Sequence, residues 1–448
     1  MGHRHRCAVL VLSKVRAGGH LYYLEPTGRT GGPAREPPGR WAGQGSAAWG
    51  LRGRVEPEAL GALLEGADPR TGLPLGADRR QVTVAGYDLS FCAPKSVSVL
   101  HGLTEPDVRR AVGDAHDRAV SAALGYVEDH ALAVRRRNDE GGRAVLPVEP
   151  APAAVFLHRT SRADDPHLHS HVLVPNVGRG PEGDVSALDG RGVYAHRAAT
   201  ASLYHAQLRH ELTAALGVAW GPLDRGRAEI AGIGTEVRRA FSRRSAAIAA
   251  HLADRGLAGP AGTSRRASTV AFFVTRPEKN LDVPVDDLRR EWRRRGRELG
   301  LGPLRLEALL DRSPRRAARD VGREGTDQEI YRALVTVRPA SSSFTRRDAV
   351  RAWAGTLPWG APAADVERVA DAFLARVGRS GAPGGRGRDP GGAGVAETRH
   401  GLPEDLGRAV ADRGGDRREE RRLLEALLAR RGMALVADRA LGRGVELG

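Results

Sequence analysis

Apolar and polar residues alternate in several short stretches of the first half of the chain, a pattern typical of β-strands. The stretches are rich in β-branched or aromatic residues and are bounded by residues that favour turns. We therefore expect strands at residues 8–13, 84–91, 126–134, 143–148, 154–157 and 172–174. The last two flank turn residues at 162–166 and form a predicted β-hairpin.

Apolar residues at helical spacing predict helices elsewhere in the chain. These cover residues 56–64, 105–124, 197–216 and 417–431, and residues 228–299 are helical and dense in arginine. His205 and His210 fall in the helix at 197–216, where we expect them at the surface or its boundary. Glycine, proline and arginine dominate residues 27–40 and 378–394 without a period, which predicts loops or linkers.

The composition indicates two or more domains and a polyanionic partner. The chain has 448 residues, of which 41% are apolar, and a formal net charge of +16. Only Lys14, Lys95 and Lys279 are lysines, so arginine carries most of the positive charge. A GC-rich coding bias also produces arginine in place of lysine, but the charge excess itself favours nucleic acid. The arginine-dense helices at 228–299 are interpreted either as a basic wall for a DNA backbone or as a solvated face.

Cysteine usage and hydropathy predict a cytoplasmic protein with no membrane insertion. Cys7 and Cys92 are too few for a disulfide framework, and no run of eighteen apolar residues occurs. The apolar run at residues 7–12 is shorter than the core of a signal peptide. No lysine follows a glycine, which excludes the phosphate-binding loop G-x-x-x-x-G-K-[ST], so we expect no ATPase or helicase activity in this chain.

The predicted hairpin concentrates histidines. Side chains of a strand alternate between faces, so His167, His169 and His171 point the same way, and a turn centred on residues 164–165 places His158 roughly opposite His171. Three imidazoles on one face can hold a divalent metal ion and leave other coordination positions open for water or substrate. The alternative is a polar strand exposed to solvent.

Two further motifs allow both a chemical and a structural interpretation. Tyr22 and Tyr23 are adjacent in a chain with seven tyrosines, and such a pair is ordinarily packing unless phosphate chemistry lies nearby. Lys95 and Ser96 follow Pro94 at a predicted helix start, where backbone amides could meet a phosphate. The same residues also fit an ordinary strand-to-helix turn.

Several motifs in fixed order resemble the TrwC/TraI type of conjugative relaxase, the MobF class of the HUH endonucleases. The resemblance covers about residues 8–300. It is carried by Tyr22-Tyr23, Leu51-x-Gly53-x-Val55, Asp68-Pro69-x-Thr71-Gly72, Gly86-Tyr87-Asp88-Leu89-Ser90-Phe91, Ala93-Pro94-Lys95-Ser96, His158-Arg159-Thr160-Ser161-Arg162, Asp165-Pro166-His167-Leu168-His169-Ser170-His171 and Phe241-Ser242-Arg243-Arg244.

The resemblance implies an α+β fold: an antiparallel palm-like sheet of the HUH or ferredoxin-like kind, flanked by helices and followed by a mostly helical C-terminal region. We expect a relaxase domain at 1–300, with the palm at about 1–225 and a helical part that clasps DNA at about 226–300. We expect a linker at 301–340, a helical lead-in resembling the start of a helicase domain at 341–377, a linker at 378–396 and a helical tail at 397–448.

The resemblance also implies the chemistry: site-specific nicking and transfer of one DNA strand at a conjugative transfer origin through a 5′-phosphotyrosine. By position Tyr22 matches the nucleophile, with Tyr23 as the second candidate, Asp88 the acidic residue, and His158, His169 and His171 the ligands of a divalent ion. Mg²⁺ or Mn²⁺ is the expected ion, and Zn²⁺ or Ni²⁺ also suits the ligands.

The expected partners are single-stranded or hairpin DNA at the origin, accessory transfer proteins and a separate helicase. The residues expected to contact DNA are Lys95, Ser96, Arg159, Arg162, Arg243 and Arg244.

The sequence departs from the family pattern in two respects that bear on the chemistry. No tyrosine lies between Tyr23 and Tyr87, where the family commonly has a second nucleophile for a second strand transfer. His167 precedes the two-histidine strand and could compete as a ligand, although its place at the turn favours an exposed side chain. Two alternatives therefore stay open: a rolling-circle replication initiator or transposase of the same chemistry, and a non-catalytic remnant that binds origin DNA.

Overall fold

The computed structural model describes residues 10–16, 36–76, 83–137, 143–257, 264–277, 283–311, 326–337, 343–380, 398 and 400–401. Tyr22 and Tyr23, the predicted helix at 417–431 and nearly all of the predicted tail at 397–448 lie outside these residues. Among the described residues, no helix is both long and apolar enough to cross a membrane.

A five-stranded antiparallel sheet forms the centre of the molecule, in the order β1-β3-β7-β6-β2. Its strands are β1 (Leu10–Val15), β2 (Arg40–Ala42), β3 (Gly86–Cys92), β6 (Ala153–Thr160) and β7 (Pro166–Pro175). The long pair β6 and β7 is the predicted hairpin. The expected antiparallel palm is thus confirmed.

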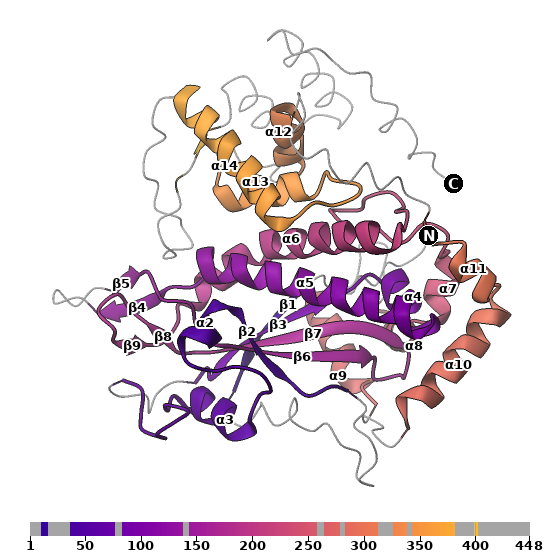
Figure 1. The fold of residues 1–448 in the computed structure, drawn as a ribbon, viewed down its shortest axis with the longest axis horizontal. Helices are drawn as coiled ribbons and strands as arrows, with labels where there is room; N and C mark the ends of the chain where they lie inside the picture. The colour runs from indigo at the N-terminus through magenta and orange to yellow at the C-terminus, as the bar shows by residue number, and fades with distance from the viewer. Residues whose placement is uncertain are drawn as a thin grey trace.

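Helices cover one face of this sheet (Figure 1). They are α2 (Gly43–Ala48), α4 (Lys95–Leu103), α5 (Pro106–His130) and α6 (Gly190–Leu216). Tyr87, Leu89 and Phe91 of β3 point into this layer and are at most 5% exposed. Since strand side chains alternate, Asp88 and Ser90 of β3 face the opposite side of the sheet.

The opposite face is divided into an apolar end and a polar end. Helix α3 (Pro57–Glu65) packs Leu60 and Leu63 against Phe156 and Leu173 at the apolar end. Gly66, in the left-handed region with a φ of 80°, ends this helix, as glycine commonly does. The histidines of β6 and β7 occupy the polar end of the same face.

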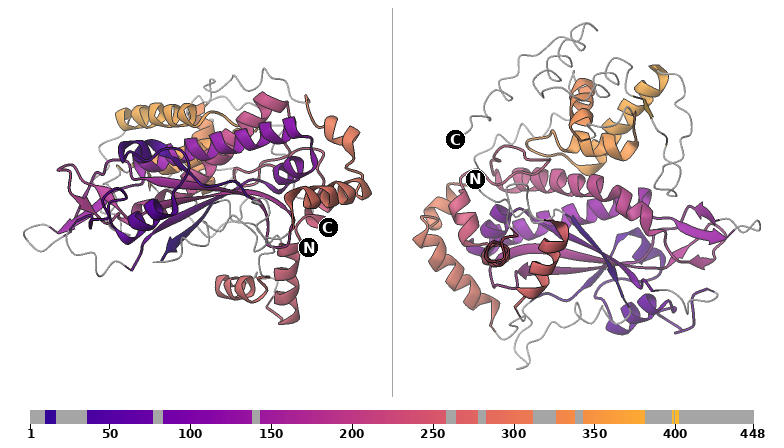
Figure 2. Two further views of the ribbon diagram at one scale, coloured as in Figure 1. Left: turned by 60° about the horizontal axis from the view of Figure 1, so that its bottom comes forward. Right: turned by 180° about the vertical axis from the view of Figure 1, so that it is seen from behind.

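The described residues between 228 and 299 are largely helical, as the sequence predicts. Its helices are α7 (Thr235–Ala240), α8 (Arg243–Asp254), α9 (Arg265–Val274), α10 (Val285–Glu298) and α11 (Pro303–Glu307). Helix α10 anchors this segment because Trp292, 2% exposed, joins the main core beside α4. Figure 2 shows α8 and α9 projecting from the side of the sheet opposite α5 and α6.

A second core lies on the outer side of α6. It is built from α12 (Thr326–Val337), α13 (Arg346–Ala354) and α14 (Ala363–Ser380), which pack against Ala199, Leu203 and Ala206 of α6. The segment at 301–340, expected to be a linker, therefore contributes two helices, α11 and α12. The wider domain division stays a prediction.

Three small strand pairs complete the described elements. They are β4 (Val134–Arg137) with β5 (Arg143–Leu146), β8 (Gly178–Arg179) with β9 (Val185–Ser186), and β10 (Ser343–Phe344) with β11 (His400–Gly401).

Two predictions about the helices α5 and α6 are wrong. Most of the strand expected at 126–134 is helix, because Val120, Ala123, Leu124 and Val127 continue the apolar stripe of α5 into the core. His205 is 2% exposed rather than at the surface, since α6 lies between two cores and is buried on both sides.

Candidate metal centre

The hairpin of β6 and β7 brings three histidines together, in a register that differs from the predicted one. His158 lies opposite His169, whereas Phe156 lies opposite His171. The pairing shifts at a bulge between His158 and Thr160, and Asp164 in the turn adopts a left-handed φ of 54°. The turn therefore displaces the partner of His158 by two residues, which leaves the imidazoles on the predicted face.

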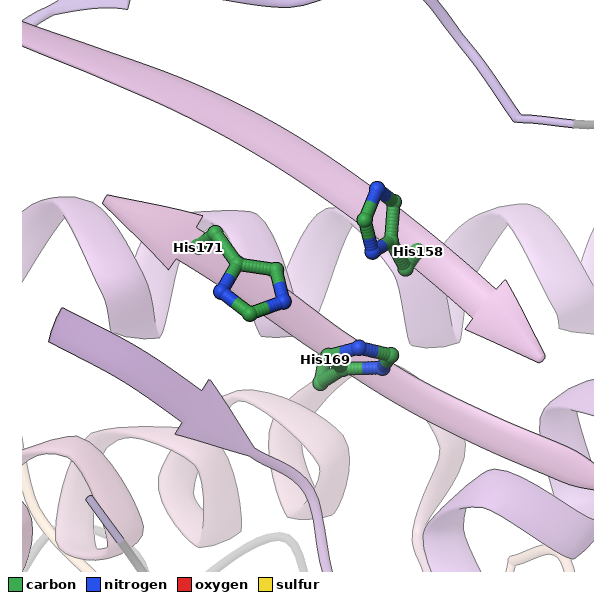
Figure 3. A group of neighbouring side chains, drawn as sticks. All are labelled: His158, His169 and His171. Atoms are coloured by element: carbon green, nitrogen blue, oxygen red, sulfur yellow. The ribbon is translucent and has the colours of Figure 1, made fainter. Parts of the chain in front are cut away.

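His158, His169 and His171 each offer a ring nitrogen to one cluster, in which these nitrogens lie within 4.8 Å of one another. Figure 3 shows the three rings converging, one from β6 and two from β7. The ring centroids are 5.1–5.2 Å apart. His158 is 7% exposed, and the other two are partly buried. Three imidazoles on a rigid hairpin suit a divalent metal ion with open coordination positions.

Hydrogen bonds fix two of the rings through their other nitrogen. His171 Nδ1 lies 2.9 Å from Asp88 Oδ2 and 2.9 Å from Ser90 Oγ, and the buried Asp88 comes from the neighbouring strand β3. His169 Nδ1 lies 2.9 Å from the backbone oxygen of His167. A proton on Nδ1 in both rings directs the Nε2 lone pair to the cluster, which is the usual arrangement around metal-binding histidines. The donor set therefore fits a divalent metal ion.

His167 is partly buried and stacks on His169 with 4.4 Å between ring centroids, so the expected exposure is wrong. Burial lowers its pKa well below the ordinary value, and the neighbouring His169 and Lys95 lower it further. The ring lies beside the cluster of three ligands and is not a member of it.

Glu36 holds the β6 side of the site in place. Its carboxylate accepts hydrogen bonds from the backbone nitrogen of Arg159, from Arg159 Nε and from Thr160 Oγ1, all at 3.0 Å. Arg159, expected to contact DNA, is thus paired within the fold and only partly exposed. Glu36 is absent from the residues that the sequence pattern singles out, although it is the only acidic residue between positions 26 and 55.

Ser96 is fully buried, which contradicts its expected contact with DNA. Its backbone amide donates to Glu229 Oε2 at 2.8 Å, and its hydroxyl accepts from the amide of Ile230 at 2.7 Å. A carboxylate therefore occupies the N-terminus of α4 where a phosphate was considered. Lys95 Nζ donates to the backbone oxygen of Pro166 at 2.9 Å, so it supports the start of β7.

Arg243 and Arg244 at the start of α8 have different surroundings. Arg243 binds Asp165 of the hairpin turn, through its backbone nitrogen at 2.7 Å and its Nε at 2.9 Å. Arg244 donates to the backbone oxygen of Thr275 at 2.7 Å, and its guanidinium lies 5.2 Å from the ring centroid of Phe272. Arg162 lies on the hairpin turn and is partly buried. Contacts of Arg162, Arg243 and Arg244 with DNA stay predictions.

A buried histidine supports the far side of β7. His116 Nε2 lies 2.9 Å from Ser170 Oγ, and its Nδ1 lies 2.8 Å from the hydroxyl of Tyr204. Ser170 sits between His169 and His171 on the opposite face of the strand. Burial lowers the pKa of His116 to about 3, so it is neutral at ordinary pH.

Comparison with known proteins agrees with this architecture. The family model "TrwC relaxase" matches residues 10–299. The multifunctional conjugation protein TraI of Escherichia coli is 32% identical over an alignment of 343 residues, which covers 71% of this chain and 18% of TraI. TraI of strain K12 is 30% identical over the same length. The chain thus spans about a fifth of the length of the curated relatives it matches.

Solved structures with the same fold include those of the conjugative relaxase TrwC in complex with OriT DNA. The metal-free complex has a TM-score of 0.57 and 28% identity and covers 65% of this chain and 99% of that one. A metal-bound complex has a TM-score of 0.58 and 28% identity and covers 65% of this chain and 98% of that one. With a family model matching well over half of its residues, the chain belongs to the TrwC relaxase family.

Proposed function

We propose that this protein nicks one strand of DNA at a conjugative transfer origin and transfers that strand through a covalent phosphotyrosine. The observation that carries the proposal is the cluster of His158, His169 and His171, with His171 held by Asp88. This cluster occurs in a chain of the family whose member TrwC has been solved with OriT DNA and with metal. Origin DNA, in single-stranded or hairpin form, is the proposed substrate.

The chemistry assigned to the chain is a transesterification. The hydroxyl oxygen of Tyr22 forms a bond to the scissile phosphorus, the bond from phosphorus to the 3′ oxygen breaks, and the 3′ oxygen receives a proton while the tyrosine loses one. The 5′ end stays on the protein, and rejoining reverses the same steps. Because the ordinary pKa of tyrosine is about 10, the reaction needs a site that favours the phenolate and offsets the phosphate charge.

His158, His169 and His171 would hold the divalent ion, which when bound supplies positive charge that polarises the phosphoryl oxygen. Asp88 keeps His171 in the tautomer that leaves Nε2 available, and both Asp88 oxygens lie within hydrogen-bonding distance of His171 Nδ1 or Ser90 Oγ. We therefore assign Asp88 to orienting the ligand in preference to accepting the tyrosine proton. Mg²⁺ or Mn²⁺ is the proposed ion, with Zn²⁺ and Ni²⁺ as binders of the same ligands.

The test uses labelled single-stranded oligonucleotides that tile the inverted repeats flanking the encoding gene. The protein is incubated with each in Mg²⁺ or Mn²⁺, and denaturing gels report a covalent adduct and a shortened labelled product. We expect both with one oligonucleotide, and neither with chelator or with Tyr22→Phe. Tyr23→Phe is the matched control, since it makes the same change one residue away and should retain adduct formation.

Two outcomes would overturn parts of this proposal. Binding of an oligonucleotide without cleavage in any metal would favour a non-catalytic DNA-binding protein. Loss of the adduct in Tyr23→Phe but not in Tyr22→Phe would move the nucleophile to Tyr23. Accessory transfer proteins and a separate helicase are further proposed partners, which co-purification with the proteins of the same element would reveal.

A further inference from the structure

Side chains from outside the metal-binding hairpin hold its turn in place through hydrogen bonds. Each residue from Ala163 to Pro166 accepts at least one hydrogen bond from a distant element, either at its backbone oxygen or, for Asp165, at its carboxylate. The donors are Arg243 to Ala163, Trp292 to Asp164, Arg243 and Arg295 to Asp165, and Lys95 to Pro166. Three of the four donors belong to the helical segment of α8 and α10.

Asp165 accepts more of these hydrogen bonds than any other residue of the turn. Its side chain is 1% exposed and accepts from the backbone nitrogen of Arg243 at 2.7 Å, from Arg243 Nε at 2.9 Å and from Arg295 at 3.3 Å. Arg295 reaches Asp165 across 130 residues of sequence. It also donates to the backbone oxygen of Ala240 at 2.6 Å and lies 4.6 Å from the ring centroid of Phe241. A buried carboxylate with two guanidinium partners ties three elements together.

A short covalent path leads from this carboxylate to the metal ligands. Asp165 is followed by Pro166 and His167, and the backbone oxygen of His167 lies 2.9 Å from His169 Nδ1. That bond orients the His169 ring, so the direction of its Nε2 depends on the position of the peptide between His167 and Leu168. Residues 163–166 lead directly into this peptide, whose amide at Leu168 is also held by Ser98 Oγ, so the position of the turn bears on the orientation of one of the three ligands.

We propose that Asp165 is a positioning residue of the metal centre, through which the helical segment of α8 and α10 sets the geometry and affinity of the histidine cluster. The proposal rests on the metal centre of the proposed function. It assigns Arg243 and Arg295 a role in metal affinity at a distance, although neither belongs to the ligand cluster. Removing the charge of Arg295 should then weaken metal binding, whereas removing a neighbouring charge on α10 should not.

The test measures binding of Co²⁺ alone to the full chain, because the visible absorption of Co²⁺ reports both affinity and ligand geometry. Arg295→Met keeps the apolar stem and removes the guanidinium, and Asp165→Asn keeps the shape and removes the charge. Arg294→Met is the matched control, because Arg294 on the same helix pairs with Glu291 and Glu298 and is 54% exposed. We expect both test variants to bind Co²⁺ about five- to tenfold more weakly with a changed absorption band, and Arg294→Met to match the wild type.

The outcomes separate the positioning role from simple stabilisation. If Arg295→Met and Asp165→Asn unfold at a lower temperature but bind Co²⁺ with unchanged affinity and spectrum, these hydrogen bonds only stabilise the fold and the inference is wrong. Should Asp165→Asn fail to fold, Arg295→Met decides, with far-ultraviolet circular dichroism as the check on folding. A wild-type chain that binds no Co²⁺ would instead overturn the metal centre of the proposed function, and this inference with it.

Discussion

At the scale of single residues, Asp88 is the group with the most direct influence on a ligand. Its carboxylate lies 2.9 Å from His171 Nδ1, and it is 3% exposed. We predict that Asp88→Asn weakens binding of Mn²⁺ about 10- to 100-fold, as loss of an outer carboxylate typically does, because the amide no longer stabilises the Nδ1 proton electrostatically. Isothermal titration with Mn²⁺ measures the change. Ser90→Ala, which removes only the neutral neighbour, is the control and should lose less affinity.

His116 makes stability depend on pH, because burial lowers its folded-state pKa to about 3. Well above the ordinary pKa of about 6.5, the residue is neutral in both states and contributes no slope. Between that pH and about 3, the unfolded state binds a proton that the native state does not, so the free energy of unfolding falls as the pH falls. We predict that His116→Gln removes about 1.4 kcal/mol per pH unit of this slope between pH 5.5 and 4.5.

Urea unfolding of the wild type and of His116→Gln measures the slope. A chelator is present in both experiments, so that metal binding does not contribute to the pH dependence. Other buried histidines add to the slope of both proteins equally, so the difference between them isolates His116. Parallel slopes in the wild type and His116→Gln would show that this histidine takes up a proton in the native state.

At the scale of elements, the hairpin shows what the sequence predicts and what it does not. Alternation placed His167, His169 and His171 on one face because the side-chain period of a strand is local. The predicted register is wrong because Thr160 pairs with Pro166, which centres the turn near residue 163. At the bulge, Arg159 and Thr160 also bind Glu36, which lies more than 120 residues away. Contacts of this range leave no period in the sequence.

The helices show the same division between local and distant causes. The sequence pattern predicts the apolar stripe of α5. It favours a strand for the C-terminal turns of this helix because Tyr126 and Val127 also suit β structure. Helix α6 is buried on two sides, so its polar face is small and its first turns carried no clear amphipathic signal. The sequence does not predict the second core because α13 meets α6, and α12 meets α13, only in the folded chain.

Glu36 anchors the chain just after the segment that carries Tyr22 and Tyr23. Its three hydrogen bonds to β6 place that anchor beside His158. We predict that Glu36→Gln lowers the rate of adduct formation about 10-fold or more, while oligonucleotide affinity changes less than threefold, because misplacing a nucleophile costs rate more than binding. Single-turnover kinetics and fluorescence anisotropy measure the two quantities.

Glu58→Gln is the control for Glu36→Gln, since Glu58 is an exposed glutamate in the first turn of α3. It should change neither quantity. Equal losses of rate and affinity in Glu36→Gln would indicate a general loss of folded protein, and an unchanged rate would show that Glu36 has no part in placing the tyrosine.

At the scale of the whole molecule, the net charge of +16 does not mean that every arginine is available to bind DNA. The arginine run of α10 is one of the candidates for a basic wall in the sequence, yet the five arginines between positions 289 and 295 each have a carboxylate partner. The pairs are Arg289 with Asp286, Arg290 with Asp287, Arg293 with Glu105, Arg294 with Glu291 and Glu298, and Arg295 with Asp165. Pairing within the fold is therefore the better interpretation of these arginines, exposed at Arg290 and Arg294 and largely buried at Arg295.

Positive charge gathers instead around Arg244, beside the hairpin turn. The guanidinium groups of Arg244 and Arg276 lie 5.2 and 5.9 Å from the ring centroid of Phe272. Burial lowers the pKa of Arg244, and the positive charges of Arg276 and Arg162 lower it further. A bound phosphate would relieve this repulsion. Because contacts with single-stranded DNA release counterions, the logarithm of affinity should fall with the logarithm of salt concentration by about 0.7 per phosphate contacted.

We predict that Arg244→Gln reduces this slope by about 0.7, the loss of one phosphate contact, and that Arg290→Gln leaves it unchanged. The slope comes from fluorescence anisotropy with a labelled single strand between 50 and about 300 mM NaCl, at fixed pH. The comparison is matched because both changes remove one unit of positive charge, so a slope set by net charge alone would fall equally in the two variants. A larger fall in Arg290→Gln would return α10 to the DNA interface and show that its ion pairs open when DNA binds.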